Sequence, residues 1–535
     1  MTNEKYDDDE PIVSTATDQD ELGQGSLGSA NDVGKVPVKF DNEPELPLGD
    51  TNYELLLELS GRGASTSRLG ADIVMVLDVS GSMEGEKLIE MKRALQFVIR
   101  KLSSSDRLSV ISFASDADRK CPLRQITPTS REEIDFLVQK LVADGSTNIS
   151  AGLTTALKVL DDRKLTTARS GAIMLMSDGM QNAGGDARDI SVGRFPVFTF
   201  GFGTAAEYDS AVLNDIAKKS NGGTFSLSNP GDLSVVFSQC LGGLLSVLVQ
   251  EVKLILTPQT DKVSRREKVT TKINKVYAGN YPQSTDAATG IVTVTFGDLY
   301  QSEIRTVLVD LFLPAVSKEV DLDALEIVCS YRGETGNPTS TNPALFRVIR
   351  SSTPVTKQTD ATKAEIKRVE IIELMKEARA LADQNNLEEA LNKVIQARNM
   401  LEDLDLQKPN PVIETLKFEL DEMVKFLQTE ETYKNKGRSF TYSSETSHDR
   451  QRFASRGDVE KIRPYAIPRM DKYRDQAKEF EKDPTKPIPT AAEDEKQEVA
   501  ADPLAAIAPS LSHYLEVAID ALKNINKIVN QRASA

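Results

Sequence analysis

The chain has 535 residues, of which 39% are apolar, and a formal net charge of −16. This length allows about three domains, and the acidic balance argues against nucleic-acid binding. The three cysteines are far apart and odd in number, so neither a disulfide framework nor a cysteine zinc cluster is expected. The sequence starts without a signal-peptide pattern, and no apolar run approaches the roughly 20 residues that span a membrane. These features predict an intracellular, cytoplasmic protein without a membrane span.

The N-terminal segment 1–48 is strongly acidic, with 12 acidic and 3 basic residues. Few of its residues are aromatic, and this composition predicts a disordered tail. Residues 53–60, YELLLELS, follow as a short strand, and a folded domain is expected to begin there.

Between residues 71 and 228, apolar runs alternate with helical patterns. ADIVMVL at 71–77 and GAIMLMS at 171–177 are continuous apolar runs, which are typical of strands buried on both faces. Residues 88–102 instead repeat apolar side chains at helical spacing. This alternation predicts an α/β domain with a doubly wound, mostly parallel sheet over residues 53–242.

The pattern changes again in the C-terminal half. Residues 245–350 contain alternating β-rich runs separated by Gly, Pro and Asn, which predicts an antiparallel β-sandwich. Residues 360–430 predict a C-terminal helical region, with helices near 362–384, 387–405 and 411–430. The polar, proline-containing stretch 431–509 predicts a linker.

Three alanines in the helical region have the spacing of a tetratricopeptide unit: Ala378, Ala390 and Ala397. One unit is weak evidence because a stack needs about three. An ordinary helical hairpin or bundle is therefore the preferred interpretation of residues 360–430.

The last predicted element is an amphipathic helix over residues 510–532. Its apolar residues step alternately by four and three positions from Leu511 to Val529, which makes a seam of nearly three heptads. Such a helix docks on the protein's own core or pairs with another helix. A coiled-coil partner, or self-association through 511–530, is therefore one expected interaction.

Polar side chains follow the apolar strands where each strand ends. Asp78, Ser80 and Ser82 come directly after the first strand, and Asp178 follows GAIMLMS. Thr147 lies in a third loop, DGSTNIS, just before a helical pattern. Because ligands of open parallel sheets bind at the carboxyl ends of the strands, these five side chains are expected to converge.

Two carboxylates and three hydroxyls form an all-oxygen set, which suits Mg²⁺ or Mn²⁺ and is poor for zinc or copper. Adjacent carboxylates repel each other unless a cation lies between them. Neutral hydroxyl ligands leave that cation electrophilic, so an Asp or Glu of a partner protein could replace a bound water. Asp and Ser after a strand also serve as helix N-caps, but three matching loops favour the metal site.

Small residues near the predicted ligands are expected to shape the surface around the metal. Gly81 allows a tight loop between the two serines. Gly81, Met83 and Gly179 are predicted to contact the partner protein.

The segments DVSGS at 78–82, GSTNISAGL with Thr147, and SDG with Asp178 resemble the metal-ion-dependent adhesion site of von Willebrand factor A domains. The resemblance implies a Rossmann-like fold and a Mg²⁺ held directly or through water. The ligands it implies are Asp78, Ser80, Ser82, Thr147 and Asp178. It also implies a domain that binds proteins and is not catalytic.

A wider resemblance, over residues 66–460, is to intracellular A-domain proteins related to the plant wavy-growth family of E3 ubiquitin ligases. DRLSVISFAS at 106–115, the sandwich segment, and SHDRQRFASRGD at 447–458 carry it. Those ligases have a RING finger, which needs about eight Cys or His zinc ligands. This sequence has neither residue before the A domain. The alternative function is therefore a non-catalytic partner or competitor of RING-bearing ligases in ubiquitination.

Catalytic alternatives find little support in the sequence, so the chain is expected not to be an enzyme. Its two histidines, His448 and His513, both lie outside the predicted A domain, which disfavours a Ser-His-Asp or Cys-His set. Hydrolysis by a metal-activated water is weaker still, because the ligands are neutral hydroxyls and no base is nearby. The integrin-type tripeptide at 456–458 is attributed to chance.

Overall fold

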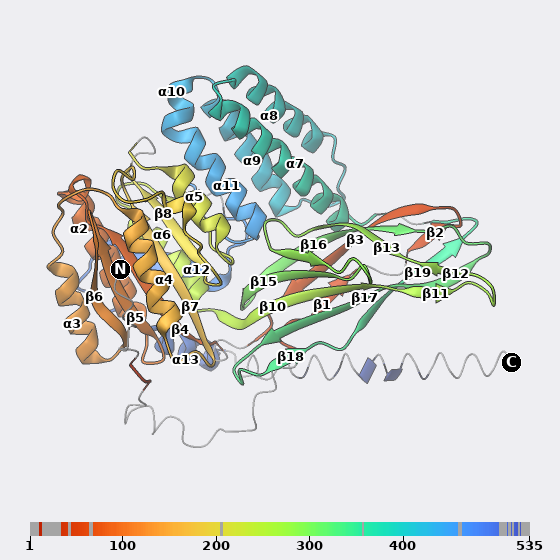
Figure 1. The fold of residues 1–535 in the computed structure, drawn as a ribbon, viewed down its shortest axis with the longest axis horizontal. Helices are drawn as coiled ribbons and strands as arrows, with labels where there is room; N and C mark the ends of the chain where they lie inside the picture. Colours follow the sequence, from red (N-terminus) through yellow and green to blue (C-terminus); the bar gives the residue numbers. More distant parts are fainter. Residues whose placement is uncertain are drawn as a thin grey trace.

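The computed structural model contains an α/β domain, a β-sandwich and a helical bundle, which pack against one another (Figure 1). It describes residues 10–12, 34–40, 44–63, 68–203, 207–355, 358–457 and 463–501, together with residues 511, 515, 518, 519, 521, 522 and 525.

The α/β domain is built on a six-stranded sheet. Its strands, in spatial order, are β6 (Ala117–Gln125), β5 (Arg107–Phe113), β4 (Gly70–Asp78), β7 (Arg169–Ser177), β8 (Val197–Phe202) and β9 (Phe225–Ser228). All neighbouring strands are parallel except β5 and β6, which are antiparallel. The predicted α/β fold with a mostly parallel sheet is confirmed.

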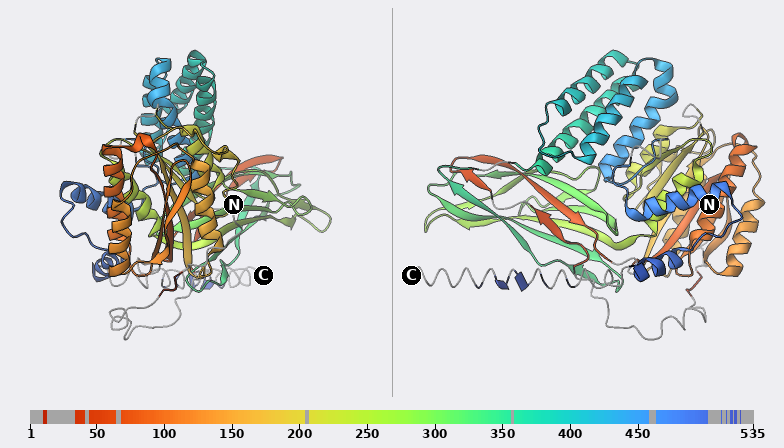
Figure 2. Two further views of the ribbon diagram at one scale, coloured as in Figure 1. Left: turned by 60° about the vertical axis from the view of Figure 1, so that its left-hand side comes forward. Right: turned by 180° about the vertical axis from the view of Figure 1, so that it is seen from behind.

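Helices cover both faces of this sheet (Figure 2). One face carries α2 (Glu86–Lys101), α3 (Pro128–Gln139) and α6 (Leu233–Leu244), and the other carries α4 (Ile149–Asp162) and α5 (Ser210–Lys219). In β4, Ile73 and Met75 point into the first core, while Val74 and Val76 point into the second. A strand with two buried faces has no solvent-facing side, which explains its continuous apolar run.

The sandwich consists of two mainly antiparallel sheets around one core. The first contains β1 (Val38–Phe40), β3 (Thr51–Ser60), β16 (Ile304–Leu313) and β13 (Lys272–Tyr277). The second contains β14 (Gln283–Thr285), β15 (Val292–Tyr300), β10 (Val247–Pro258), β17 (Val320–Arg332), β19 (Ala344–Ser351) and β2 (Glu45–Pro47), with β18 (Pro338–Ser340) beside β17. A small hairpin joins β11 (Thr260–Lys262) to β12 (Lys268–Thr270).

Two predictions for the N-terminal region are wrong. The strand at 53–60 belongs to the sandwich and not to a domain over 53–242, because β3 pairs with β16 along its whole length. The strands β1 and β2 lie inside the segment 1–48 that was predicted to be disordered. The α/β domain is thus inserted into the sandwich: β1 pairs with β3, whereas β3 and β2 pair with β16 and β19, which follow the α/β domain in the sequence. Within 1–48, residues 1–9, 13–33 and 41–43 lie outside the described residues.

The helical bundle occupies the predicted region 360–430 and extends beyond it. It contains α7 (Asp360–Asp383), α8 (Leu387–Glu402), α9 (Pro411–Phe426), α10 (Glu430–Thr432), a π-helical turn (Tyr433–Gly437) and α11 (Arg438–Arg450). Ala378, Ala390 and Ala397 are buried in its core, where small side chains let the helices approach closely.

The predicted linker over 431–509 is also wrong. This stretch contains α11, α12 (Pro468–Lys482) and α13 (Ala491–Ala501). Helix α11 lies between the bundle and the α/β domain, where Thr446 Oγ1 donates a hydrogen bond to Asn214 Oδ1 at 2.5 Å. Helix α12 packs on α6. It also contacts α2, where the ring centroid of Phe97 lies 5.7 Å from that of Phe480. The segment is as polar as a linker because its side chains form hydrogen bonds across a domain boundary, where they are buried.

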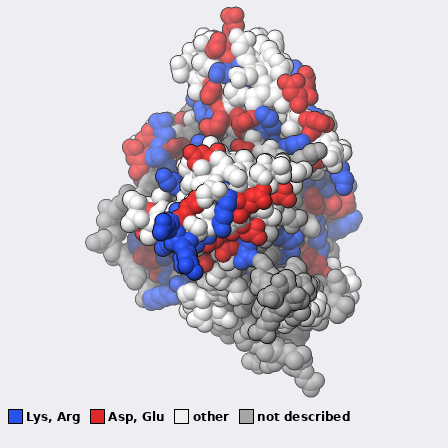
Figure 3. Space-filling model, turned by 90° about the vertical axis from the view of Figure 1, so that its right-hand side faces the viewer, with Lys and Arg blue, Asp and Glu red and all other residues white. Residues whose placement is uncertain are grey.

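The predicted terminal helix over 510–532 lies mostly outside the described residues. Its described seam residues, among them Leu511, Leu515 and Leu522, are helical and exposed. Across the described part of the chain, no helix is both long and apolar enough to cross a membrane. Seen from the sandwich end, basic and acidic side chains are interspersed over the surface (Figure 3).

Candidate metal centre

The candidate metal centre lies at the carboxyl ends of β4 and β7. Asp78 is the last residue of β4, and Asp178 follows Ser177, the last residue of β7. The two strands are parallel neighbours, with Leu77 opposite Met176, so both aspartates leave the sheet at the same edge. Neither aspartate has any exposed surface.

Serine hydroxyls join the two carboxylates. The Ser80 backbone N–H donates to Asp78 Oδ1 at 2.9 Å, and the Ser80 and Ser82 hydroxyl oxygens are 3.1 Å apart. Ser82 Oγ then donates to Asp178 Oδ1 at 2.7 Å. Ser177 Oγ donates to the second oxygen of Asp78 at 2.6 Å. The hydroxyls therefore form a continuous path from one carboxylate to the other.

Backbone contacts bring the third loop to the same place. The Gly81 N–H donates to the Gly145 carbonyl at 3.0 Å, which ties the first loop to the loop that carries Thr147. A Cβ atom on Gly179 would lie 3.1 Å from Thr147 Oγ1 and 3.5 Å from Ser82 Oγ. Both hydroxyls therefore border the same glycine. The structure brings together all five side chains that the sequence predicts as metal ligands.

The two buried carboxylates give the site a negative charge that a cation would neutralise. The pKa of Asp78 is raised to about 6, mainly by burial and to a smaller extent by the charge of Asp178, against the opposing hydrogen bonds from Ser177 and Ser80. Two carboxylates shielded from water repel each other strongly, because little solvent screens their charges.

Lys87, in the first turn of α2, supplies one positive charge. Its Nζ lies 2.7 Å from Asp178 Oδ2 and 3.1 Å from Glu207 Oε2. Burial acts to lower the pKa of Lys87, but the bonds to Asp178 and Glu207 outweigh it and raise that pKa above its ordinary value. With Lys87 alone as counter-ion, the two aspartates keep an excess of one negative charge.

Lys87, Ser177 and Glu207 are site residues that the sequence analysis missed. A signal for Lys87 was available, since side chains in a helix lean towards its N-terminus and therefore back towards the preceding DVSGS loop. Ser177 directly precedes Asp178 and could have been named as a strand-end hydroxyl. Glu207 lies in a loop after β8, and no local pattern places it near the site.

The donor set fits a hard divalent cation. It consists of oxygen atoms only, with two carboxylates and three neutral hydroxyls, as Mg²⁺ and Mn²⁺ prefer. The described residues contain no group of three or more His, Cys, Asp or Glu side chains that could hold a metal ion. The candidate at the carboxyl edge of the sheet has two carboxylates, so it depends on the hydroxyl groups as further ligands.

The prediction that Met83 contacts a partner is wrong. Its side chain has no exposed surface and lies in the core beneath the loop, because the short helical turn at Gly81–Met83 points it inward. Gly179 is also buried, and its role is to leave room for Thr147 and Ser82. Of the three predicted contact residues, Gly81 is the one that is exposed.

The other chemical candidates are parts of the buried framework. Arg456, from the integrin-type tripeptide, is buried, and its Nε lies 2.7 Å from Glu419 Oε1, while Asp458 lies outside the described residues. His448 Nε2 lies 2.9 Å from the other oxygen of Glu419, and Nδ1 is 2.8 Å from the Tyr465 hydroxyl. Both residues hold α11 to the bundle, and neither presents a reactive group to solvent.

Comparison with known proteins agrees with this architecture. Residues 72–239 match the von Willebrand factor type A domain family, and residues 399–479 match a family described as VWA / Hh protein intein-like. The chain is 27% identical over 305 residues to the E3 ubiquitin-protein ligase WAV3 of Arabidopsis thaliana, covering 55% of this chain and 37% of that protein. It is 25% identical over 415 residues to WAVH1 of the same plant, covering 72% and 55%. The chain thus spans about half, or less, of the length of these relatives.

The fold is also found among solved structures. A von Willebrand factor type A protein from Catenulispora acidiphila aligns with a TM-score of 0.61 over 78% of this chain and 97% of its own length, at 15% identity. This likeness concerns the fold alone. Residues 72–239 therefore form a von Willebrand factor type A (VWA) domain, within a chain homologous to the Arabidopsis E3 ligases WAV3 and WAVH1.

Proposed function

We propose that the VWA domain binds Mg²⁺, or Mn²⁺, and uses it to grip an acidic side chain of a partner protein. The observation that carries this proposal is the pair of fully buried carboxylates, Asp78 and Asp178, joined by serine hydroxyls at one edge of the sheet. The proposed ligands, direct or through water, are Asp78, Ser80, Ser82, Thr147 and Asp178.

The residues of the site have two roles: some supply negative charge, and others leave the metal position open to a partner. Asp78 and Asp178 supply the negative charge, and the hydroxyls complete the oxygen set without neutralising the cation. A bound Mg²⁺ supplies an electrophilic coordination position that a carboxylate of a partner can take. Ser82 and Gly81 are exposed, so a partner can approach the centre from their side.

The proposed role is binding and not catalysis. Ser177 and Ser80 already hold Asp78 by hydrogen bonds, and Ser82 and Lys87 hold Asp178. Both carboxylates are therefore engaged as structural acceptors, and neither is free to act as a general base. An intracellular, cytoplasmic location, expected from the sequence, is part of this proposal.

Affinity purification of the intact chain tests the proposal. Partners should be captured in Mg²⁺ and lost in EDTA, and Asp178→Asn should lose the same partners in Mg²⁺. A matched control is Asp186→Asn, since Asp186 is an exposed carboxylate paired with Arg188 in the same domain. An identical set of captured proteins from wild type and Asp178→Asn, with or without EDTA, would show that the metal does not bridge partners.

A second candidate function is a role in ubiquitination as a partner or competitor of RING-bearing VWA ligases. The similarity to WAV3 and WAVH1, both named as E3 ubiquitin-protein ligases, favours it. The purified chain should be inactive alone in a ubiquitination assay, and should change the output of a RING-bearing relative added to the same reaction. Autoubiquitination by the chain alone would exclude a non-catalytic role.

A further inference from the structure

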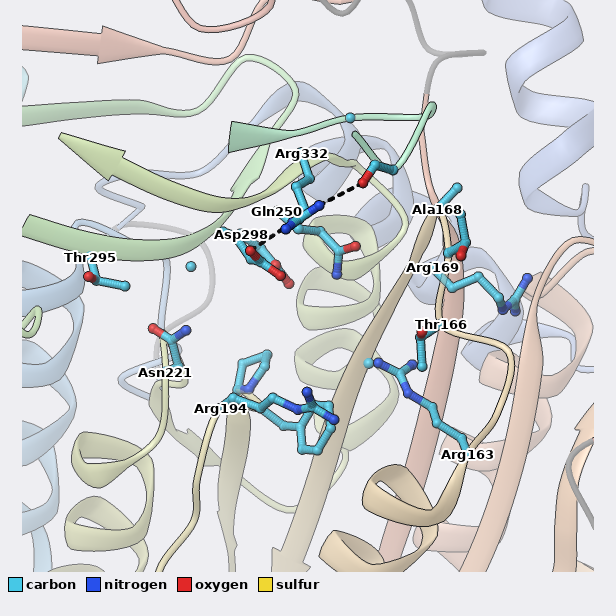
Figure 4. Close-up of a pocket in the computed structure, with 18 of the residues that line it drawn as sticks. Arg163, Thr166, Ala168, Arg169, Arg194, Asn221, Gln250, Thr295, Asp298 and Arg332 are labelled. Atoms are coloured by element: carbon cyan, nitrogen blue, oxygen red, sulfur yellow. Dashed lines mark hydrogen bonds and ion pairs between the residues drawn. The ribbon is translucent and has the colours of Figure 1, made fainter. Parts of the chain in front are cut away.

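A cavity lies at the opposite edge of the VWA sheet from the candidate metal centre. It has a volume of about 550 Å³ and lies between the amino ends of β7 and β8 and the sandwich strands β10, β15 and β17. Figure 4 shows Arg163, Arg169 and Arg194 on the VWA side and Arg332 on the sandwich side. Cavities of this size at domain boundaries commonly hold small molecules.

The floor of the cavity carries an excess of buried positive charge. Asp72, at the start of β4, pairs with three guanidinium groups: Arg107 at 2.7 Å, Arg163 at 2.7 Å and Arg169 at 2.6 Å. One carboxylate cannot neutralise three cations. The pKa of Arg163 is lowered, because its guanidinium is buried, and the neighbouring charges of Arg107 and Arg194 add to this effect.

The walls add further cations. Arg332 is matched by Glu251 at 2.9 Å. Arg194 and Lys253 also line the cavity, and within the described part of the chain neither pairs with a carboxylate. Five basic side chains line the cavity, Arg163, Arg169, Arg194, Lys253 and Arg332, against Glu251 and Asp298 of the lining and the neighbouring Asp72. The cavity therefore favours an occupant with several negative charges.

Two buried polar atoms at the cavity have no partner among the described residues. One is Arg163 Nε, a donor on a side chain that is only 6% exposed, and the other is Asn221 Oδ1, an acceptor. Polar groups of the cavity wall are therefore not fully satisfied by the protein itself.

We propose that this cavity binds a small molecule that carries a phosphate group. A phosphate group has nearly two negative charges and three acceptor oxygens, and guanidinium groups bind it through two parallel hydrogen bonds. A carboxylate has one charge and would leave most of the excess uncompensated. The occupant contacts both the VWA domain and the sandwich, so it links the two domains.

Isothermal titration of the full chain with inorganic pyrophosphate tests this site. EDTA in the buffer keeps divalent cations away, so the result is independent of the metal centre. Wild type should bind one pyrophosphate, acetate should not bind, and affinity should fall as salt rises. The double variant Arg194→Gln/Lys253→Gln should weaken binding at least 10-fold. Both side chains are exposed, and the ring contact of the Arg194 guanidinium with Phe195, at 5.0 Å, is made by an exposed cation, so the melting temperature should fall only slightly.

The matched control is Lys417→Gln/Lys482→Gln, which removes the same charge from exposed side chains outside the cavity. It should bind pyrophosphate as wild type does. Hydrogen exchange should also slow on binding at residues 163–171 and 332–336. Absence of binding to wild type, or equal weakening in both double variants, would overturn the proposal.

Discussion

The two edges of the VWA sheet carry opposite charge arrangements. At the carboxyl edge, Asp78 and Asp178 are buried together with serine hydroxyls and one lysine. At the amino edge, the single carboxylate of Asp72 is surrounded by Arg107, Arg163 and Arg169. One sheet therefore has an excess of negative charge at one end, the proposed cation site, and an excess of positive charge at the other, the proposed anion site.

This difference shows how strand register assembles charge. Asp72 lies opposite Arg107 on the neighbouring strand β5, so the arginine cluster follows from the pairing of β4 with β5. The aspartates of the other edge follow from the pairing of β4 with β7. The residues at each edge do not neutralise its net charge. A ligand of opposite charge can therefore bind there.

The amino edge gives the largest expected effect. Asp72→Asn removes one charge from β4 without changing its shape and takes this carboxylate away from three buried guanidinium groups. We expect the free energy of unfolding to fall by about 3–5 kcal/mol, measured by urea denaturation. The control Asp186→Asn, at an exposed pair, should change it little. Equal stability of the two variants would mean that the arginines are satisfied by carbonyl groups alone.

The pH dependence of the Asp72 contribution has a defined sign. Burial opposes ionisation, but the three arginines hold the pKa of Asp72 below its ordinary value of 3.8. A carboxyl whose pKa is lowered by folding adds stability above its unfolded pKa and loses it as pH falls towards the folded value. Wild type should therefore lose its advantage over Asp72→Asn only below about pH 4.

At the carboxyl edge, Lys87 and a divalent cation compete for Asp178. Lys87→Met keeps most of the side-chain volume and removes the ammonium group, so Mg²⁺ affinity should rise about 10-fold, which corresponds to about 1.4 kcal/mol. Isothermal titration with Mg²⁺ measures it. Lys92→Met, on the same helix, is the control because Lys92 bonds only the Gln139 carbonyl. Unchanged or weaker Mg²⁺ binding in Lys87→Met would contradict a competitive role.

The smallest expected effect concerns Asp298 in the cavity. Burial raises its pKa to about 6, although Arg452, Arg305 and Arg163 act to lower it and Glu303 raises it slightly. Because folding raises this pKa, the carboxyl group costs stability in full above about pH 6, and the cost fades as pH falls from the folded pKa to the unfolded pKa of about 4. Asp298→Asn should therefore stabilise the protein at pH 7.5 and raise pyrophosphate affinity a few-fold.

At pH 5, where Asp298 is mostly protonated in the folded protein, the difference in pyrophosphate affinity between wild type and Asp298→Asn should vanish, and the difference in stability should fall to about half of its value at pH 7.5. Asp323→Asn is the matched control, since Asp323 pairs with Arg347 in the sandwich, outside the cavity. A difference in affinity that persists unchanged at pH 5 would show that the carboxylate charge of Asp298 is not its cause.

How much the sequence could predict depended on the range of the interactions. The five predicted ligands follow strand ends or precede a helix, so a local pattern with the rule for parallel sheets was enough to bring them together. The same rule could not identify Asp72. It sits inside the apolar run ADIVMVL, and its importance comes from arginines on β5 and β7.

The domain boundaries could not be predicted because strands far apart in the sequence pair with each other. β3 pairs with β16, about 250 residues later, so no local pattern could assign YELLLELS to the sandwich. Helix α11 was read as linker because its side chains are polar, yet Arg450 and its neighbours bond to other domains. Burial of satisfied polar groups leaves no hydrophobic periodicity to detect.

The central claim is that Asp78 and Asp178 hold a divalent cation, and titration of Mg²⁺ into metal-free protein tests it most directly. Wild type should bind one Mg²⁺ per chain, and Asp178→Asn, which keeps the shape of the site, should bind it at least 100-fold more weakly. The Asp186→Asn control should match wild type. Absence of Mg²⁺ binding in wild type, or equal affinity in wild type and Asp178→Asn, would contradict the account.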